Sequence, residues 1–259
     1  MTREDIINNH YSNTYDEDIR LTKDNYHSLE YITTKVYIDK YLKPGDRILE
    51  VGAGTGAYSL HYAGLGYKVN SIEFVNRNLD VLKSKITSNM DIVAEQGDAV
   101  DLSRFSDNTF DMTLVLGPLY HLYTDEEINK AISEAIRVTK KDGIITIAYL
   151  TNDSVFASWA IDHLLDDEIH FNENFELRRI PEEVFATFYI KEFKDIMSKY
   201  NVVHLHDVAT DGIAPIIGDR VNALSKEEFD VWIKYHLSTC EREDLQGYSS
   251  HMLYICKKK

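Results

Sequence analysis

Apolar and polar residues alternate in two distinct patterns over the first 150 residues. Short apolar runs, typical of buried strands, occupy 47–51, 68–74, 92–95, 110–116 and 144–150. Segments with apolar residues at helical spacing lie between them, at 24–42, 57–65, 76–88 and after Thr124, which forms a capping box with Glu127. This alternation predicts a doubly wound α/β fold, a parallel sheet with helices on both faces.

The pattern changes after residue 150. Residues 151–200 read as one long, mostly helical stretch rich in aromatic and charged residues. A strand at 202–208, a helix from 225 to about 240 and a strand at 251–256 follow, which brings the predicted sheet to seven strands.

The helical stretch is therefore an insertion between strands five and six. It follows the carboxyl end of strand five, the edge where such sheets bind ligands, so we expect a substrate cap. An extra helical layer without a site is the alternative. The predicted parts are an N-terminal helical arm or lid (1–43), a core (44–150), the insertion (151–200) and the rest of the core sheet (201–259).

Composition narrows the class of partner. The 259 residues carry 43 acidic and 28 basic side chains, a formal charge of −15, which argues against nucleic-acid binding. Two cysteines, Cys240 and Cys256, are too few for a disulfide framework. The polar N-terminus is unlike a signal peptide, and no apolar stretch is long enough to span a bilayer, so a cytoplasmic protein without membrane contact is expected.

A glycine-rich turn follows the first strand, in the stretch ILEVGAGTG. Glycines at this place let the backbone approach a ligand closely, and the next helix offers free N–H groups. The spacing Gly52-x-Gly54-x-Gly56 is not the G-x-G-x-x-G of dinucleotide sites. Glu50 would also repel a pyrophosphate, whereas it suits a ligand with a cationic end.

The motif E-x-G-x-G-x-G resembles motif I of the class I S-adenosylmethionine (SAM)-dependent methyltransferases, in the small-molecule, UbiE-like branch. Three further segments follow that family in order: Glu73 at the end of the second strand, the stretch QGDAVDL, and the stretch FDMTLVLGPLYHL. The resemblance covers about residues 29–150. The last two strands fit the family's reversed final hairpin in outline.

The resemblance implies SAM as cofactor and S-adenosylhomocysteine as product. It implies that Glu73 accepts hydrogen bonds from the ribose, that Asp98 takes the adenine amino group and that the Ala99 N–H faces an adenine ring nitrogen. The residues expected to bind cofactor are Glu50, Gly52, Ala53, Gly54, Thr55, Gly56, Glu73, Phe74, Asp98, Ala99, Leu116, Gly117 and His121. Each carboxyl also has a structural alternative: Glu50 as a cap, Glu73 as a solvated strand end, Asp98 in an Asx turn.

Methyl transfer is an in-line displacement in which the protein positions the acceptor. His121 is the candidate base or acceptor-orienting group, since its intrinsic pKa suits proton uptake near neutrality. Packing or helix capping is its alternative. Tyr120 could orient an acceptor, although core packing is equally compatible. From the N-terminal arm, Tyr15 is a third catalytic candidate and Arg20 a pocket candidate, with a plain surface helix as the alternative.

Two motifs are weak. Gly117-Pro118 lacks the leading amide or acid of amino-methyltransferases. His204 and His206 lack nearby partners for a metal site, so no metal is expected.

The sequence thus predicts a SAM-dependent methyltransferase acting on a small molecule. The alternatives are a SAM-binding regulatory protein without catalysis and a methyltransferase for protein or RNA. A nicotinamide-dependent oxidoreductase is disfavoured by the glycine spacing. The acceptor, the attacked atom and the oligomeric state stay open.

Overall fold

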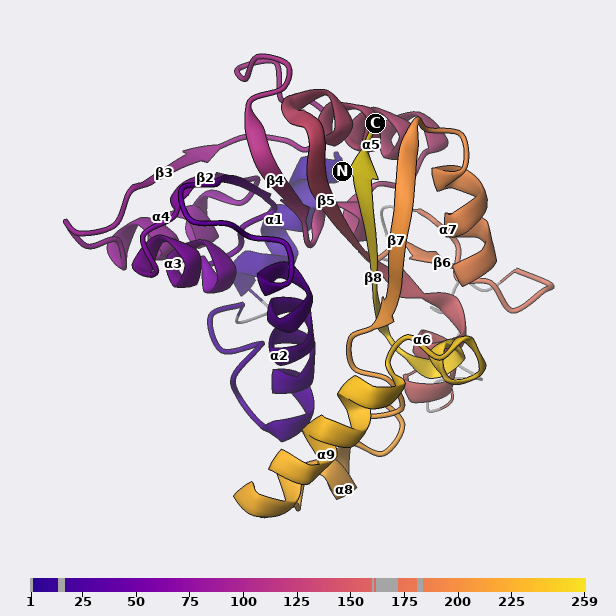
Figure 1. Cartoon of the computed structure of the whole chain (residues 1–259). Helices are drawn as coiled ribbons and strands as arrows, with labels where there is room; N and C mark the ends of the chain where they lie inside the picture. Colours follow the sequence, from indigo (N-terminus) through magenta and orange to yellow (C-terminus); the bar gives the residue numbers. More distant parts are fainter. Residues whose placement is uncertain (1, 14–16, 160, 162–171, 181–183) are drawn as a thin grey trace.

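The sheet forms the centre of the computed structural model, which describes residues 2–13, 17–159, 161, 172–180 and 184–259 (Figure 1). Its order is β3-β2-β1-β4-β5-β8-β7, and the short β6 pairs with β5. The strands are β1 (Arg47–Val51), β2 (Lys68–Glu73), β3 (Ile92–Gln96), β4 (Phe110–Val115), β5 (Thr139–Thr151), β6 (Thr187–Phe188), β7 (Val202–Ala209) and β8 (His251–Lys258).

Strands β1 to β5 pair in parallel, and β8 runs antiparallel to β5 and β7. The predicted doubly wound fold is therefore confirmed, with the final reversed hairpin and one additional two-residue strand. Parallel pairing places the carboxyl ends of β1, β4 and β5 at one edge. The start of β8 lies at the same edge, because its first residue, His251, is opposite Leu150 near the end of β5.

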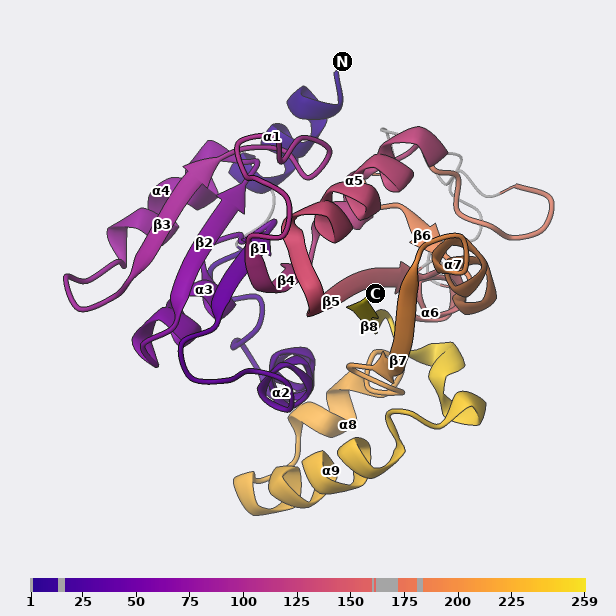
Figure 2. The same ribbon diagram turned by 45° about the horizontal axis from the view of Figure 1, so that its top comes forward.

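Helices cover both faces of the sheet. They are α1 (Arg3–Asn13), α2 (Asn25–Asp39), α3 (Ala57–Gly64), α4 (Asn76–Ser84), α5 (Asp125–Val138), α6 (Asn152–Ser158), α7 (Ile190–Met197), α8 (Gly218–Asn222) and α9 (Lys226–Thr239), with 3-10 turns at Pro118–His121 and Glu243–Tyr248. The apolar sides of α5 and α7 pack on one face, and those of α2 and α3 on the other. Figure 2 shows α5 on one side of the sheet and α2, α8 and α9 on the opposite side.

Local signals place most of these elements where the sequence predicts them. The capping box of Thr124 and Glu127 begins α5, and Ser225 with Glu228 caps α9 in the same way. Strand β5 differs, because it begins at Thr139 rather than at 144. Its register with β4 shifts before Ile144, so residues 140–143 form an irregularity inside the strand.

The prediction that 151–200 is mostly helical is wrong for the described residues. Among these residues α6 and α7 are the only α-helices, and apart from residue 161, which is in 3-10 conformation, the segment between them is extended or turned where it is described. Asn152 provides a physical reason, since its side chain accepts from the Leu177 N–H at 2.8 Å and donates to the Phe175 carbonyl at 3.0 Å. These tertiary bonds satisfy backbone groups that a helix would pair internally. Residues 160, 162–171 and 181–183 lie outside the described chain.

The N-terminal arm comprises α1 and α2. Helix α1 lies over the carboxyl edge of the sheet beside α4, where Arg77 donates to the Tyr11 carbonyl at 2.9 Å. Helix α2 packs against α8 and α9, with Leu29 and Phe229 in a small separate core. None of the helices in the described part of the chain has the length and apolar character needed to cross a membrane.

Candidate active site

The glycine turn after β1 has the backbone that only glycine adopts easily. Gly52, Gly54 and Gly56 have φ angles of 76°, 54° and 93°. A Cβ on Gly52 would lie 2.6 Å from Cδ of Pro118, so the turn is in close contact with the loop after β4. The bare backbone thus exposes the end of β1 to the space above the sheet.

Glu73 ends β2 and holds the turn. Its carboxylate accepts from the Gly54 N–H at 2.7 Å and from the Val75 N–H at 2.9 Å. Burial raises the pKa of Glu73 to about 7, and these two backbone bonds partly offset the effect. The carboxyl group is therefore poised between its two protonation states near neutral pH.

Glu50 is buried beneath the turn rather than beside the cavity. The Ser59 hydroxyl donates to it, and Ser59 also bonds the Ser71 hydroxyl at 2.6 Å. Burial raises the pKa of Glu50 to about 8, so the side chain is mostly a neutral acid at pH 7. The structure thus gives Glu50 a supporting position behind the glycines.

Phe74, Asp98 and Ala99 lie together at one end of the site, in the loops after β2 and β3. The Val100 N–H donates to Asp98 at 3.2 Å, which fixes the carboxylate. Arg3 of α1 pairs with Asp98 and lies 5.3 Å from the centre of the Phe74 ring. Helix α1 therefore covers this end of the site with a charged contact, which no pattern in the sequence indicates.

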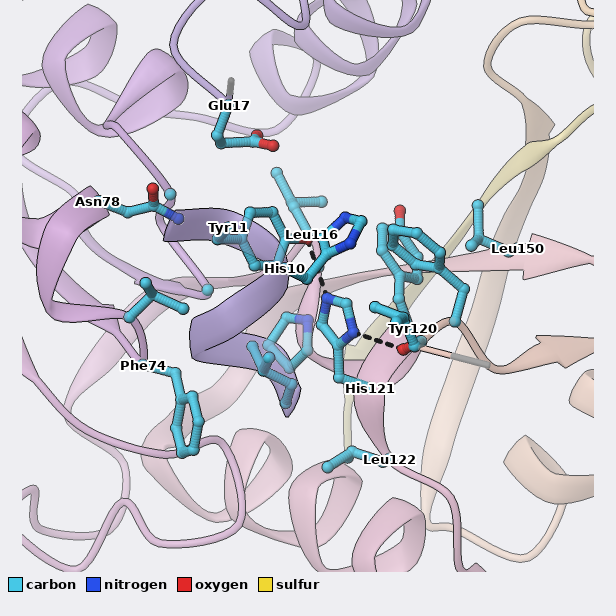
Figure 3. Close-up of a pocket in the computed structure, with 18 of the residues that line it drawn as sticks. His10, Tyr11, Glu17, Phe74, Asn78, Leu116, Tyr120, His121, Leu122 and Leu150 are labelled. Carbon is cyan, nitrogen blue, oxygen red and sulfur yellow. Dashed lines mark hydrogen bonds between the residues drawn. The ribbon is translucent and has the colours of Figure 1, made fainter. Parts of the chain in front are cut away.

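His121 joins α1 to the loop after β4 (Figure 3). Its Nδ1 lies 2.8 Å from the Val184 carbonyl and its Nε2 lies 2.9 Å from the Tyr11 hydroxyl. A carbonyl only accepts, so Nδ1 carries the proton and Nε2 accepts from Tyr11. Burial lowers the pKa of His121 to about 4, which keeps the ring neutral. Both nitrogens are thus engaged with the protein, which favours an orienting role over that of a base.

Tyr120 lies beside His121 with its hydroxyl buried. That hydroxyl has no hydrogen-bond partner among the described residues, although the side chain lines the cavity. A buried hydroxyl without a partner is costly unless a ligand satisfies it. The Tyr120 hydroxyl is thus available to orient an acceptor, as the sequence analysis expects.

A cavity of about 640 Å³ joins these groups (Figure 3). Of the residues predicted to bind cofactor, those that line it are Gly52, Gly54, Glu73, Phe74, Asp98, Ala99, Leu116, Gly117 and His121. Glu50, Ala53, Thr55 and Gly56 are not among its lining residues. Tyr15 lies outside the described residues, so its expected role stays a prediction.

Several lining residues were missed by sequence analysis, among them Arg3, Glu17 and His251. Glu17 lies over the turn, since a Cβ on Gly54 would be 3.2 Å from its Cγ. Arg20, expected as a pocket residue, does line the cavity and pairs with Glu17 at 3.1 Å and with Glu30 at 2.5 Å. No local spacing marks these positions, because only the tertiary fold brings them to the cavity.

The two histidines of β7 are not brought together as a metal site. The register of β7 shifts between them. His204 lies 3.0 Å from Asp207, while His206 contacts the Tyr41 hydroxyl and Glu241, each at 2.7 Å. Across the described ranges no group of three or more possible ligands could hold a metal ion.

Comparison with known proteins bears on the family of the chain. Residues 49–147 match a family model described as a methyltransferase domain. A demethylmenaquinone methyltransferase of Renibacterium salmoninarum is 38% identical over 105 residues, which are 40% of this chain and 41% of that protein. The chain therefore contains a methyltransferase domain. A second such relative, from Paenarthrobacter aurescens, is 35% identical over 114 residues, so the match spans about two fifths of these relatives' length.

Solved structures extend the likeness in fold beyond that domain. A SAM-dependent methyltransferase of Thermotoga maritima superimposes with a TM-score of 0.60 and 18% identity, covering 98% of this chain and 99% of that one. A SAM-dependent methyltransferase of Methanosarcina mazei has a TM-score of 0.57 and 17% identity, covering 86% and 96%. The methyltransferase fold thus includes α1, α2 and the final hairpin.

Proposed function

We propose that this protein transfers a methyl group from SAM to a small-molecule acceptor and releases S-adenosylhomocysteine. The observation that carries the proposal is Glu73, a buried carboxylate bonded to the Gly54 N–H in a cavity lined by bare glycine backbone. A carboxylate at this place accepts hydroxyl donors, and the glycines leave room for a ligand against the end of β1.

The residues present fit the cofactor that the family uses. A Cβ on Gly52 would collide with Pro118 and one on Gly54 would crowd Glu17, so the turn at this end of the cavity must stay bare. Glu73 has lone pairs left for two ribose hydroxyls. Asp98 and Phe74 would hold the adenine, with Asp98 shared between that ring and Arg3. When bound, SAM supplies an activated methyl group on a sulfonium.

The chain's own residues position the acceptor. Tyr120 would donate its unpaired hydroxyl to the acceptor, and His121 would hold α1 closed over the site through Tyr11. Holding the nucleophile on the axis of the methyl group can supply several kcal/mol, of order 7–11 at best. Closure by α1 excludes water from the same space.

The acceptor end of the cavity favours a small molecule with an apolar body. Leu150, Val155, Leu177 and Phe185 line it, and three of them belong to the expected substrate cap at 151–200. The relatives named for demethylmenaquinone support an aromatic acceptor of this kind. The acidic composition also argues against RNA as acceptor.

The buried thiols of Cys240 and Cys256 agree with the reducing cytoplasm as compartment.

Isothermal titration with S-adenosylhomocysteine tests the proposal. We expect Glu73→Ala to weaken binding more than tenfold, because two bonds to a charged acceptor, roughly 1.5–3 kcal/mol each, are lost. Glu95→Ala, an exposed glutamate on the neighbouring β3, is the matched control and keeps the wild-type affinity. NAD should not bind.

The same titration has a pH signature. Hydroxyl donors prefer ionised Glu73, whose pKa in the free protein is about 7. Wild-type affinity should therefore fall as the pH drops from 8 to 6, by up to about tenfold per pH unit at the acid end. Absence of binding by folded protein would remove the methyltransferase proposal, and binding without turnover on any metabolite would favour the regulatory alternative.

A further inference from the structure

His251 stands at the carboxyl edge of the sheet, on the far side of the cavity from the glycine turn. It is the first residue of β8 and lines the cavity next to Leu150. In the sheet, β8 is two strands away from β4, a separation of about 10 Å. The space between the loop after β4 and His251 is therefore the acceptor end.

Asp211 fixes the ring of His251. The carboxylate lies 2.8 Å from Nδ1 of His251, and it also accepts from the backbone N–H of His251 at 3.2 Å. The Ser249 hydroxyl donates to its other oxygen at 2.6 Å. Since Asp211 is only 2% exposed, the neutral form of His251 carries its proton on Nδ1 and has its lone pair on Nε2.

Nε2 of His251 faces charge but makes no hydrogen bond within the described residues. Its neighbour is Glu30 of α2, at 3.6 Å, which Arg20 holds through two bonds of 2.5 and 3.1 Å. The ring of Tyr120 is 5.9 Å from that of His251. The titratable groups around His251 are thus Asp211, Glu30, Arg20 and Tyr120, with Glu17 beyond Arg20.

An imidazolium at this place would lie between two carboxylates. Glu30 and Asp211 raise the pKa of His251 against the effect of burial. A base whose conjugate acid is stabilised in this way is suited to a weakly acidic proton. His121, by contrast, has both nitrogens bonded to the protein.

We propose that the acceptor is an aromatic or enolic hydroxyl compound and that His251, oriented by Asp211, takes its proton. The inference rests on the proposed function. The hydroxyl oxygen would form the new bond to the methyl carbon, while the carbon–sulfur bond breaks and its electron pair stays on sulfur. The hydroxyl proton passes to Nε2 of His251 and from there to water.

The surroundings select this class of acceptor over others. A carboxylate or phosphate acceptor would meet Glu17 in the cavity wall, with Glu30 and Asp211 behind it against His251, and these carboxylates would repel it. An amine would be held as an ammonium ion by those carboxylates and lose its nucleophilic lone pair. A neutral hydroxyl on a flat ring fits between the apolar walls, with Tyr120 donating to its oxygen.

A coloured phenol tests the inference without knowledge of the natural acceptor. The probe is 4-nitrophenol, whose phenolate and neutral forms differ in absorption, added to protein saturated with S-adenosylhomocysteine at a pH below the pKa of the free phenol. We expect the bound probe to contain at least about tenfold more phenolate than the free probe, the ratio that one pKa unit gives. In His251→Gln and Asp211→Asn this excess should disappear.

The controls separate the outcomes. His204→Gln replaces an exposed histidine of β7 and should keep the excess of phenolate. 4-Nitroanisole has the same ring without the proton and should bind the apolar walls with little spectral change. Two results would overturn this inference: an excess of phenolate that persists in His251→Gln, or no saturable binding of 4-nitrophenol. Neither result touches the proposed function as long as S-adenosylhomocysteine still binds. Failure to bind S-adenosylhomocysteine would overturn both.

Discussion

Two buried carboxyl groups, Glu50 and Glu73, stand behind and beside the glycine turn. Burial raises the pKa of both, to about 8 and about 7. Folding therefore takes up protons that the unfolded chain would release, and this opposes folding at neutral pH. A charge-binding site commonly costs the free protein stability in this way.

Glu50→Gln should make the free protein more stable at pH 8. The ordinary pKa of the group is 4.5 and the folded value is about 8, so its stability contribution is present below pH 4.5 and lost as the pH rises to 8. Glutamine cannot ionise, so the variant should gain a few kcal/mol at pH 8 but only about 1 kcal/mol at pH 5, since one pKa unit corresponds to about 1.4 kcal/mol. Thermal unfolding across this pH range measures the difference in stability between the variant and the wild type.

The exposed Glu173 provides the control for that comparison. Glu173→Gln should follow the wild type at every pH. If the difference in stability between Glu50→Gln and the wild type does not grow with pH, Glu50 is ionised in the folded protein.

At the scale of elements, α1 is fastened to the site by side chains at both ends. Arg3 bonds Asp98 and, at 3.0 Å, Glu127, which itself caps α5. Tyr11 bonds His121 near the other end. A cover held by a few partly exposed contacts can open without unfolding the sheet beneath it.

Arg3→Ala should loosen α1 selectively. Two partly exposed ion pairs are lost, each worth roughly 0.2–1 kcal/mol, so amide exchange of residues 3–11 should become several-fold faster. Hydrogen–deuterium exchange read by mass spectrometry follows this helix against β4 as an internal reference. Arg242→Ala, which removes an exposed pair with Asp244, should leave α1 unchanged, and equal exchange of α1 in both variants would show that Arg3 does not fasten it.

At the scale of the whole molecule, cofactor binding should stabilise the entire fold. The site draws residues from α1, from the turns after β1, β2 and β4, and from β8, so the ligand binds only when the sheet is assembled. At one hundred times its Kd, S-adenosylhomocysteine should add about 2.7 kcal/mol and raise the Tm by about 5–10 °C. A thermal shift assay checks this, with NAD giving no shift and Glu73→Ala a reduced one; a shift as large in that variant would contradict the role of Glu73.

The central sheet was predictable because its information is local. Parallel strands buried on both faces read as apolar runs, and Thr124 with Glu127 marks a helix start within four residues. Glu73 and Asp98 could be placed because each follows a recognisable strand. The segment 151–200 could not, since its structure depends on Asn152 bonding to residues 23 and 25 positions away.

The acceptor end was equally beyond sequence analysis. Arg3, Glu17 and His251 are separated by most of the chain and carry no spacing that relates them. Asp211 and His251 meet only because β7 and β8 pair, with Ala209 opposite Met252. Such groups become visible once the order of the strands is known.

The position of β8 between β5 and β7 bears on biosynthesis. Every residue of the glycine turn and of the first five strands leaves the ribosome before residues 251–258 do. Until then β5 has an open edge in the nascent chain, and such an edge is exposed to mispairing with other polypeptides. The same late insertion delivers His251, so a nascent chain would acquire the parts for its cofactor well before the group that we propose for proton removal.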